Sequence, residues 1–228
     1  MTRIAVLTPD PADLSYASQW PGVRDRLAAA LALEGIEAVA TPWTDHIDDA
    51  AGLADYPLIL PMIVWGYHRD HGRWLRACAT WAAAGLPLAN PASVLAWNSD
   101  KTYLARLAAR GVPMPATIWS EAVTADTVAA AFASTGADRL IVKPTVSGGA
   151  WKTLRLSPGE VFSDAPEGSA MIQPFLPTIE TAGETSLLFF GGTFSHAVNK
   201  RPVNGDFRIQ TQFGGLYTPV ASPPVGAL

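Results

Sequence analysis

The sequence has little cysteine, no long apolar run and no excess of positive charge. Its single cysteine, Cys78, excludes an intrachain disulfide framework and a cysteine-based metal site. No apolar stretch approaches the ~20 residues that a membrane-spanning helix needs. The 16 Lys and Arg against 20 Asp and Glu give a formal charge of −4, which argues against a nucleic-acid or membrane partner. Residues 1–8 have the pattern of a strand and not of a signal peptide, so we expect a cytoplasmic globular protein.

The first ninety residues alternate short apolar runs with helical patterns. Runs typical of buried strands lie at 3–8, 37–43 and 58–64, and apolar residues recur at helical spacing from Pro21 and around Trp74. This alternation predicts an α/β domain with a parallel, Rossmann-like sheet between helices. Such sheets bind ligands beyond the carboxyl ends of their strands. In the loops expected there, the candidate substrate residues are Gln19, Trp20, Trp65 and Tyr67.

The later part of the chain has a different pattern. A helix is expected from about Asp100 to Arg110, followed by a buried strand at 140–144. From Met171 onward, alternating polar and apolar residues predict antiparallel strands, the last of them at 206–213. His68 and His71 fall in a loop without metal-ligand spacing, so we expect them at the surface.

One hairpin can be predicted residue by residue. Residues 184–190 and 193–200 flank Gly191-Gly192, which has the composition of a two-residue turn. That turn would pair Glu184 with Asn199 and place Arg201 on the same face. The polar faces carrying Arg201 and Arg208 either meet water, as is common in antiparallel sheets, or line a phosphate site, because the arginine fork suits phosphate.

Two lysines depart from local rules. Lys101 would oppose the dipole of the predicted helix by a few tenths to ~1 kcal/mol, and Lys143 ends an apolar strand. Each is either a solvated or snorkelling lysine or a cation directed at a bound anion. The segment 145–150 is rich in glycine but is not a Walker loop. It is either an ordinary turn or a loop whose backbone N–H groups cover phosphates.

Several motifs together resemble the ATP-grasp superfamily over nearly the whole chain. Their order and spacing carry the resemblance: Asn98-Ser99-Asp100-Lys101, Ile141-Val142-Lys143-Pro144, Ser147-Gly148-Gly149, Gln173-Pro174-Phe175-Leu176, Gly183-Glu184, Asn199-Lys200-Arg201 and Asp206-Phe207-Arg208. The resemblance implies an ATP-grasp fold. Its parts would be a pre-ATP-grasp substrate domain at 1–90, a small lobe with linker helices at 91–170 and a large, incomplete lobe at 171–228.

The resemblance also implies roles for individual residues. Lys101 and Lys143 would neutralise ATP phosphates, while Ser147, Gly148 and Gly149 would form a flap over them. Gln173 and the backbone near Phe175 and Leu176 would bind adenine, and Glu184 would lie near the ribose. Arg201 and Arg208 would act as the catalytic residues that steady the transferred phosphoryl group, since phosphoryl transfer depends mostly on positioning and charge stabilisation.

A closer likeness is to the O-ureido-serine cyclo-ligases within this superfamily. It rests on the segments Thr8–Asp13, Gln19–Arg24, Pro174–Thr181 and Phe189–Ala197. The resemblance implies that a small amino acid, O-ureido-D-serine, is activated by ATP as an acyl-phosphate and closed to D-cycloserine, with release of ADP, phosphate, carbon dioxide and ammonia. An intermolecular amide ligase of glutathione-synthetase type and a non-catalytic nucleotide-binding module remain alternatives. A homo-oligomer is also left open.

One departure concerns the metal. The superfamily uses Mg²⁺ held by acidic and amide side chains, and residues 216–228 contain no acidic residue. We therefore expect no metal ligands in this chain. Either the sequence is a fragment and the magnesium ligands of the family lie beyond Leu228, which we favour, or the metal centre has been lost.

Overall fold

The computed structural model describes residues 1–203 and 205–223 and divides into two compact units. The first unit contains Met1–Met114 and Thr145–Gly148, and the second contains Pro115–Pro144 and Gly149–Leu228. The chain thus crosses between the units three times, and the short return at Thr145–Gly148 belongs to the first. No helix among the described residues has the length and apolarity that a membrane crossing requires.

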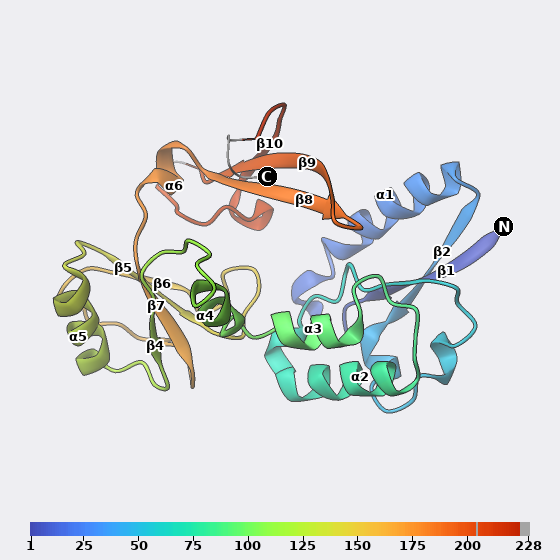
Figure 1. Cartoon of the computed structure of the whole chain (residues 1–228), viewed down its shortest axis with the longest axis horizontal. Helices are drawn as coiled ribbons and strands as arrows, with labels where there is room; N and C mark the ends of the chain where they lie inside the picture. Colours follow the sequence, from blue (N-terminus) through green and yellow to red (C-terminus); the bar gives the residue numbers. More distant parts are fainter. Residues whose placement is uncertain (204, 224–228) are drawn as a thin grey trace. The chain divides into compact units, whose positions relative to one another are not determined.

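The first unit is built on a parallel three-stranded sheet, as the sequence predicted (Figure 1). The strand order is β2-β1-β3, with β1 at Thr2–Thr8, β2 at Ile36–Pro42 and β3 at Ile59–Leu60. The predicted strand at 58–64 therefore pairs over only two residues, although Ile63 beyond it is fully buried. The α-helices are α1 (Trp20–Leu33), α2 (His71–Ala83), α3 (Ala92–Asn98) and α4 (Tyr103–Ala108). Short 3₁₀ helices are η1 (Leu14–Tyr16), η2 (Trp43–His46), η3 (Ala51–Leu53) and η4 (Tyr67–Asp70).

A cluster of aromatic residues forms the centre of the first unit. The ring of Trp74 on α2 lies 5.5 Å from Trp43, 5.6 Å from Trp81 and 5.1 Å from Tyr67. Trp81 also donates its indole N–H to the carbonyl of His46 at 2.8 Å, which satisfies its buried polar atom. Cys78 is buried in the same core, as predicted, and burial raises the pKa of its thiol to about 12. This core fixes the loops that follow β1 and β3.

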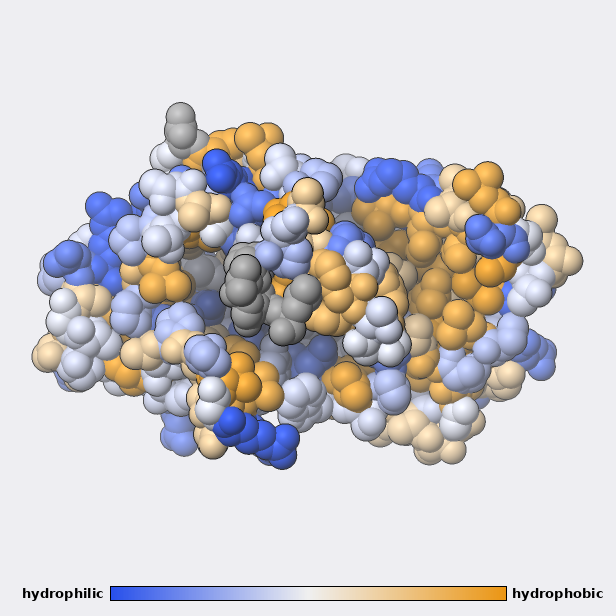
Figure 2. Space-filling model, turned by 45° about the horizontal axis from the view of Figure 1, so that its top comes forward, coloured by the Kyte–Doolittle hydropathy of each residue, from blue (hydrophilic) through white to orange (hydrophobic). Residues whose placement is uncertain are grey.

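Helix α1 packs less deeply than α2. Its side chains Val23, Leu27 and Leu31 form the expected stripe and are half-buried, but no residue of α1 is fully buried. The neighbouring edge strand β2 has no fully buried residue either. Figure 2 accordingly shows apolar residues gathered on the surface at the end where α1 and β2 lie.

The second unit contains two antiparallel sheets. One has the order β4-β7-β5-β6, with β4 at Ile118–Ser120, β5 at Leu140–Pro144, β6 at Leu154–Leu156 and β7 at Ala170–Pro174. Helix α5 (Ala125–Thr135) covers it, and Val128, Leu140 and Ile172 belong to their shared core. The other has the order β10-β9-β8, with β8 at Glu184–Phe190, β9 at Thr193–Arg201 and β10 at Leu216–Val220. Helix α6 (Thr178–Thr181) and the 3₁₀ helix η5 (Thr211–Phe213) complete the unit.

The predicted hairpin is present, but its predicted register is wrong beyond the turn. Phe190 pairs with Thr193 and Phe189 with Phe194 as expected, and a bulge at Ser195 then shifts every later pair by one residue. Glu184 consequently lies opposite Lys200 and not opposite Asn199. Since one extra residue moves the following side chains to the other face, Arg201 shares a face with Asn199 and Thr185 and not with Glu184.

The strand predicted at 206–213 is wrong. Residues 206–209 are a loop, and Thr211–Phe213 is a 3₁₀ turn. The physical reason lies in Asp206, whose Oδ1 accepts the backbone N–H groups of Phe207 at 2.7 Å and Arg208 at 2.9 Å. These local bonds compete with strand pairing, and they decide the conformation.

Candidate functional site

Lys101 is held by the glycine-rich segment that returns to the first unit. Its backbone N–H donates to the carbonyl of Thr145 at 2.9 Å, and its ammonium donates to both the carbonyl and the Oγ of Ser147 at 2.8 Å. Only one residue, Pro144, separates Lys143 from Thr145. The two predicted phosphate lysines are therefore tied, one by hydrogen bonds and one covalently, to the same short segment.

The predicted helical position of Lys101 is wrong. Lys101 lies in a turn, and α4 begins only at Tyr103 and is six residues long. Asp100 explains the difference, because its carboxylate accepts the N–H of Thr102 at 2.9 Å and favours a turn. The ammonium of Lys101 is thus oriented by Ser147 and Thr145.

His68 lies beside Lys101 and is buried, so the predicted surface position of this histidine is wrong. A Cβ added to Gly148 would stand 3.1 Å from its Nδ1, which places the imidazole against the glycine-rich segment. Burial, followed by the nearby charges of Arg69 and Lys101, lowers its pKa to about 4. His68 is therefore neutral at pH 7, and no local sequence signal pointed to it.

The loop after β1 meets the segment after β3 through Asp13. Its Oδ1 accepts the N–H of Ser15 at 3.0 Å, and its Oδ2 lies 3.3 Å from Nε of Arg69. Gly66 adopts φ +88°, and a Cβ there would come within 2.9 Å of Asp13 Oδ2. Only a glycine allows the carboxylate this close to the backbone.

A cavity of about 340 Å³ opens at this junction. Its lining combines aromatic rings with charges of both signs: Asp10, Ala12, Asp13, Trp43, Trp65, Gly66, Arg69, Asp70 and Arg73. It lies at the carboxyl ends of β1 and β3, where a parallel sheet binds its ligands. Its volume is at the lower end of the range of small-molecule sites.

The four predicted substrate residues take different positions around this junction. Trp65 lines the cavity and packs against Tyr16 with ring centroids 5.6 Å apart. Tyr67 packs into the aromatic core instead, and burial raises the pKa of its hydroxyl. Gln19 and Trp20 stand at the start of α1 and are not part of the cavity lining.

In the second unit, Lys143 is a half-buried cation one residue before the end of β5. Burial lowers the pKa of its ammonium, and the carboxylate of Glu184 opposes that shift. A desolvated lysine gains free energy when an anion approaches it. The position therefore suits a phosphate ligand.

The predicted adenine-binding segment lies at the end of β7. Gln173 is buried and donates its Nε2–H to Oγ1 of Thr117 at 2.8 Å. The N–H of Phe175 already donates to the carbonyl of Arg139 at 2.9 Å, so this donor is occupied. Leu176 is half-exposed.

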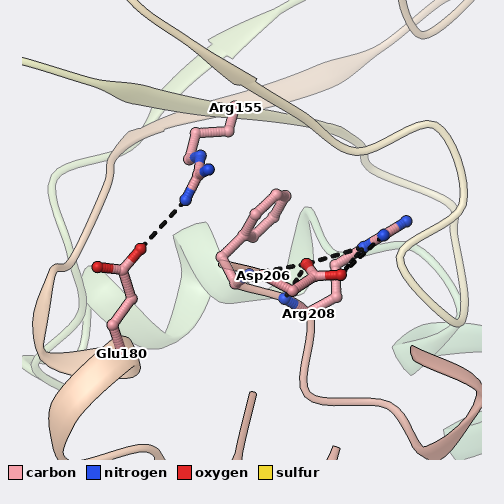
Figure 3. A network of polar contacts seen from close by, with 5 residues as sticks. Arg155, Glu180, Asp206 and Arg208 are labelled. Carbon is pink, nitrogen blue, oxygen red and sulfur yellow. Dashed lines mark hydrogen bonds and ion pairs between the residues drawn. The ribbon is translucent and has the colours of Figure 1, made fainter. Parts of the chain in front are cut away.

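Arg155 on β6 is a neighbour of this segment that the sequence did not indicate. Its guanidinium carbon lies 5.5 Å from the ring of Phe175 and 5.0 Å from that of Phe207, and its Nη1 lies 3.1 Å from Glu180. Figure 3 shows Arg155 pointing toward Glu180, with the Asp206–Arg208 pair beside them. The two aromatic rings and the carboxylate hold this cation in place.

The two arginines predicted as catalytic are each held by a neighbour. Nε of Arg201 donates to Oδ1 of Asn199 at 3.1 Å. Arg208 makes a forked pair with Asp206, at 3.0 and 3.1 Å from Nε and 2.8 Å from Nη2 (Figure 3). Its guanidinium carbon also lies 3.7 Å from the ring centre of Phe213. Side-chain hydrogen bonds to Arg208 lower the pKa of Asp206 to about 2.

The other predicted nucleotide residues fall in both units. Ser147 and Gly148 belong to the first unit, and Gly149 belongs to the second, where a Cβ would stand 3.2 Å from Nε2 of Gln212. Glu184 pairs with Lys200 at 3.4 Å. Within residues 1–203 and 205–223, no group of three or more His, Cys, Asp or Glu side chains could hold a metal ion.

Comparison with known proteins gives this arrangement a context. Residues 4–90 match the family described as the N-terminal domain of D-cycloserine synthetase DcsG. The cycloserine biosynthesis protein DcsG of Streptomyces lavendulae is 28% identical over 178 residues, which cover 73% of this chain. The matched region spans 58% of the length of that relative.

Solved structures show the fold. The crystal structure of D-cycloserine synthetase DcsG superposes with a TM-score of 0.72 at 23% identity, covering 97% of this chain and 75% of the other. The D-alanine–D-alanine ligase of Bacillus anthracis, in complex with ATP, gives a TM-score of 0.65 at 16% identity over 98% and 72% of the two chains. A RimK-domain ATP-grasp protein of Sphaerobacter thermophilus gives 0.58 at 19% identity over 89% and 87%. The ATP-grasp fold predicted from the sequence is confirmed.

Proposed function

From this ATP-grasp chain, whose residues 4–90 match the N-terminal domain of a D-cycloserine synthetase, we propose an ATP-dependent carbon–nitrogen ligase that closes O-ureido-D-serine to D-cycloserine. The match of residues 4–90 is the observation that carries the proposal. It concerns the domain that holds the charged cavity, and substrate choice in a shared fold depends on such sites.

The phosphates of ATP bind Lys101 and Lys143 in this proposal. The hydrogen bonds from Lys101 to Ser147 fix its ammonium in advance, which reduces the ordering cost of binding. Burial takes hydrating water away from the ammonium group of Lys143. A negatively charged phosphate oxygen compensates for this lost hydration. The short Thr145–Gly148 segment, with Gly149 after it, covers the phosphates through backbone N–H groups.

The adenosine part binds in the second unit. Gln173 and the backbone at Phe175 and Leu176 contact adenine, and because the N–H of Phe175 is occupied by Arg139, other groups of the segment make the base contacts. Glu184 lies near the ribose. Arg201 and Arg208 stabilise the charge that develops on the transferred phosphoryl group.

The reaction has two bond-forming steps. A carboxylate oxygen of the substrate attacks the γ-phosphorus, the bond to ADP breaks and an acyl-phosphate forms. The ureido nitrogen bonded to oxygen then attacks the acyl carbon, phosphate leaves with the bonding electrons and the nitrogen loses its proton. Water finally removes the carbamoyl group as carbon dioxide and ammonia. Tethered attack gains from proximity, and exclusion of water from the site protects the acyl-phosphate before closure.

Mg²⁺ accompanies ATP in enzymes of this kind and prefers carboxylate, carbonyl and water oxygens. The described residues contain no group of three or more His, Cys, Asp or Glu side chains that could hold a metal ion. No step proposed here is therefore routed through a metal held by this part of the chain.

Calorimetry with ATP tests the nucleotide assignment. Lys101→Met and Lys143→Met should each weaken binding about tenfold or more, because a charge-assisted hydrogen bond contributes about 1.5–3 kcal/mol. Arg3→Met is a matched control, since it removes an exposed cation paired with Glu37. Arg201→Ala should leave binding unchanged and lower turnover. If both lysine variants bind ATP as tightly as the parent, the assignment fails.

Phosphate release tests the type of ligase. With O-ureido-D-serine as the sole amino acid, ATP should be consumed and D-cycloserine should appear without any added amine. A requirement for a second amine would identify an intermolecular ligase. Tight ATP binding without phosphate release would indicate a nucleotide-binding module.

A further inference from the structure

The cavity in the first unit contains an imbalance of charge. Its lining has three carboxylates, Asp10, Asp13 and Asp70, against two guanidiniums, Arg69 and Arg73. The carboxylates of Asp13 and Asp70 are engaged by backbone N–H groups, of Ser15 at 3.0 Å and of Arg73 at 3.0 Å. An excess negative charge in a partly enclosed site favours a cationic group.

Asp10 is the carboxylate best placed to receive that group. Its Oδ1 accepts the N–H of Ala12 at 2.9 Å, and its Oδ2 lies 3.4 Å from Nη1 of Arg73. Arg73 donates to Oδ2 across this 3.4 Å, whereas charge-assisted bonds are typically 2.7–2.9 Å long, so a closer ammonium ion can compete with Arg73 for the same oxygen. Asp13, in contrast, has its Oδ2 covered by the backbone at Gly66.

The walls of the cavity suit the same group. The rings of Trp43 and Trp65 contribute to the lining, and an indole face attracts cations. The ring of Trp43 already has the guanidinium carbon of Arg73 5.9 Å from its centre, so Trp65 is the ring left to an ammonium ion. Trp43 is 3% exposed, and its buried indole N–H finds no hydrogen-bond acceptor among the described residues. A closed, apolar wall beside an acceptor increases the strength of an ion pair.

The cavity is linked to the candidate phosphate lysine through neighbouring residues of the same unit. Arg69 in its wall follows His68 directly, and His68 lies against Gly148 and within the electrostatic reach of Lys101. A small amino acid held here by its ammonium would leave its own carboxylate unbound by Asp10. That free carboxylate is the group that the proposed reaction requires.

We propose that this cavity binds the ammonium group of the amino-acid substrate, with Asp10 as its acceptor and Trp43 and Trp65 as its walls. The proposal rests on the proposed function, which it deepens by naming the group that the first unit recognises. It requires an α-amino acid and discriminates against the corresponding α-hydroxy acid, whose hydroxyl carries no charge.

Calorimetry with O-ureido-D-serine and its α-hydroxy analogue tests this. Asp10→Asn keeps an oxygen for the N–H of Ala12 but removes the charge, so binding of the amino acid should weaken about tenfold or more. Binding of the hydroxy analogue should change less than twofold. Asp48→Asn is the matched control, because Asp48 pairs at 2.8 Å with Arg76, another arginine of α2, and neither residue lines the cavity. It should leave both affinities unchanged.

The outcomes separate this proposal from the proposed function. If Asp10→Asn weakens the binding of both compounds equally, or weakens neither, the ammonium site is overturned. The same holds if the parent binds neither compound, whether or not a non-hydrolysable ATP analogue is present. If the Asp10→Asn variant releases phosphate from ATP with the same KM for O-ureido-D-serine as the parent, the ammonium site is overturned and the proposed ligase function is not. If the parent binds O-ureido-D-serine more tightly than the α-hydroxy analogue but does not bind ATP, the proposed ligase function is overturned and the ammonium site is not.

Discussion

The carboxylate of Asp13 lies directly against the backbone at Gly66, close enough that a Cβ on Gly66 would stand 2.9 Å from its Oδ2. This contact joins the loop after β1 to the segment after β3 and forms one side of the charged cavity. The positive φ of +88° at Gly66 is part of the same arrangement. The shape of the cavity therefore depends on the absence of a side chain at one position.

Gly66→Ala should destabilise the protein more than a glycine substitution that costs only backbone strain. Gly35→Ala is the control, because Gly35 has φ +72° and a Cβ there meets nothing within 4 Å. The control should lose about 1–2 kcal/mol of unfolding free energy from the left-handed conformation. Gly66→Ala should lose about 1 kcal/mol more, because Asp13 must move away from Arg69. Urea denaturation measures both, and equal losses would show that the Asp13 contact does not constrain the loop.

His68 makes stability depend on pH. Burial lowers its pKa to about 4 from an ordinary value of 6.5, so the unfolded chain binds the proton more readily than the folded protein does. The neutral imidazole contributes its full stability above pH 6.5, and that contribution is lost as the pH falls from 6.5 to about 4. The total change is on the order of 3 kcal/mol.

Urea denaturation of the parent and of His68→Gln between pH 4 and 8 measures this change. The stability of the parent should fall more steeply than that of the variant across the window. His196→Gln removes an exposed histidine on β9 and should follow the parent curve. Parallel curves for the parent and His68→Gln would mean that His68 titrates in the folded protein as it does in water.

The sequence predicted those features that depend on local periodicity. The strand at 140–144, the two strands of the hairpin next to its turn and the parallel sheet all follow from apolar spacing within a few residues. The bulge at Ser195 could not be predicted in this way, because a single unpaired residue leaves the composition of both strands unchanged. The loop at 206–209 was missed because Asp206 binds its own backbone, a choice that alternation does not reveal.

The candidate site was partly accessible from the sequence. Lys101 and Lys143 were proposed because a cation is unusual at each position, and Trp65 because it lies in a loop expected at the carboxyl ends of the sheet; their roles stay predictions. His68 and Asp10 were missed because their significance arises from contacts distant in the sequence. Lys101 meets Ser147 46 residues later, and Asp10 meets Arg73 63 residues later. Burial and charge at such junctions are properties of tertiary packing.

The pairing of Asp206 with Arg208 predicts a second pH-dependent contribution to stability. The forked hydrogen bonds lower the pKa of Asp206 to about 2 from an ordinary value of 3.8. The charged carboxylate therefore contributes stability above about pH 4, and that contribution is lost as the pH falls from 3.8 to 2. Solvent screens this near-surface pair, so its size is about 1 kcal/mol, less than the full shift would give, and Asp206→Asn should lose this amount at neutral pH and little at pH 2.

Asp164→Asn provides the control, because Asp164 is an exposed acid 3.8 Å from Lys152 and such surface pairs contribute about 0–1 kcal/mol. Urea denaturation from pH 2 to 5 gives the difference between the parent and each variant. A constant difference for Asp206→Asn across that range would mean that its neutral hydrogen bonds, and not its charge, hold the loop. In that case Arg208 could leave Asp206 for a phosphate at little electrostatic cost. If the difference in unfolding free energy instead shrinks as the pH falls, the charge of Asp206 holds Arg208, and a bound phosphate must compete with Asp206 for the guanidinium.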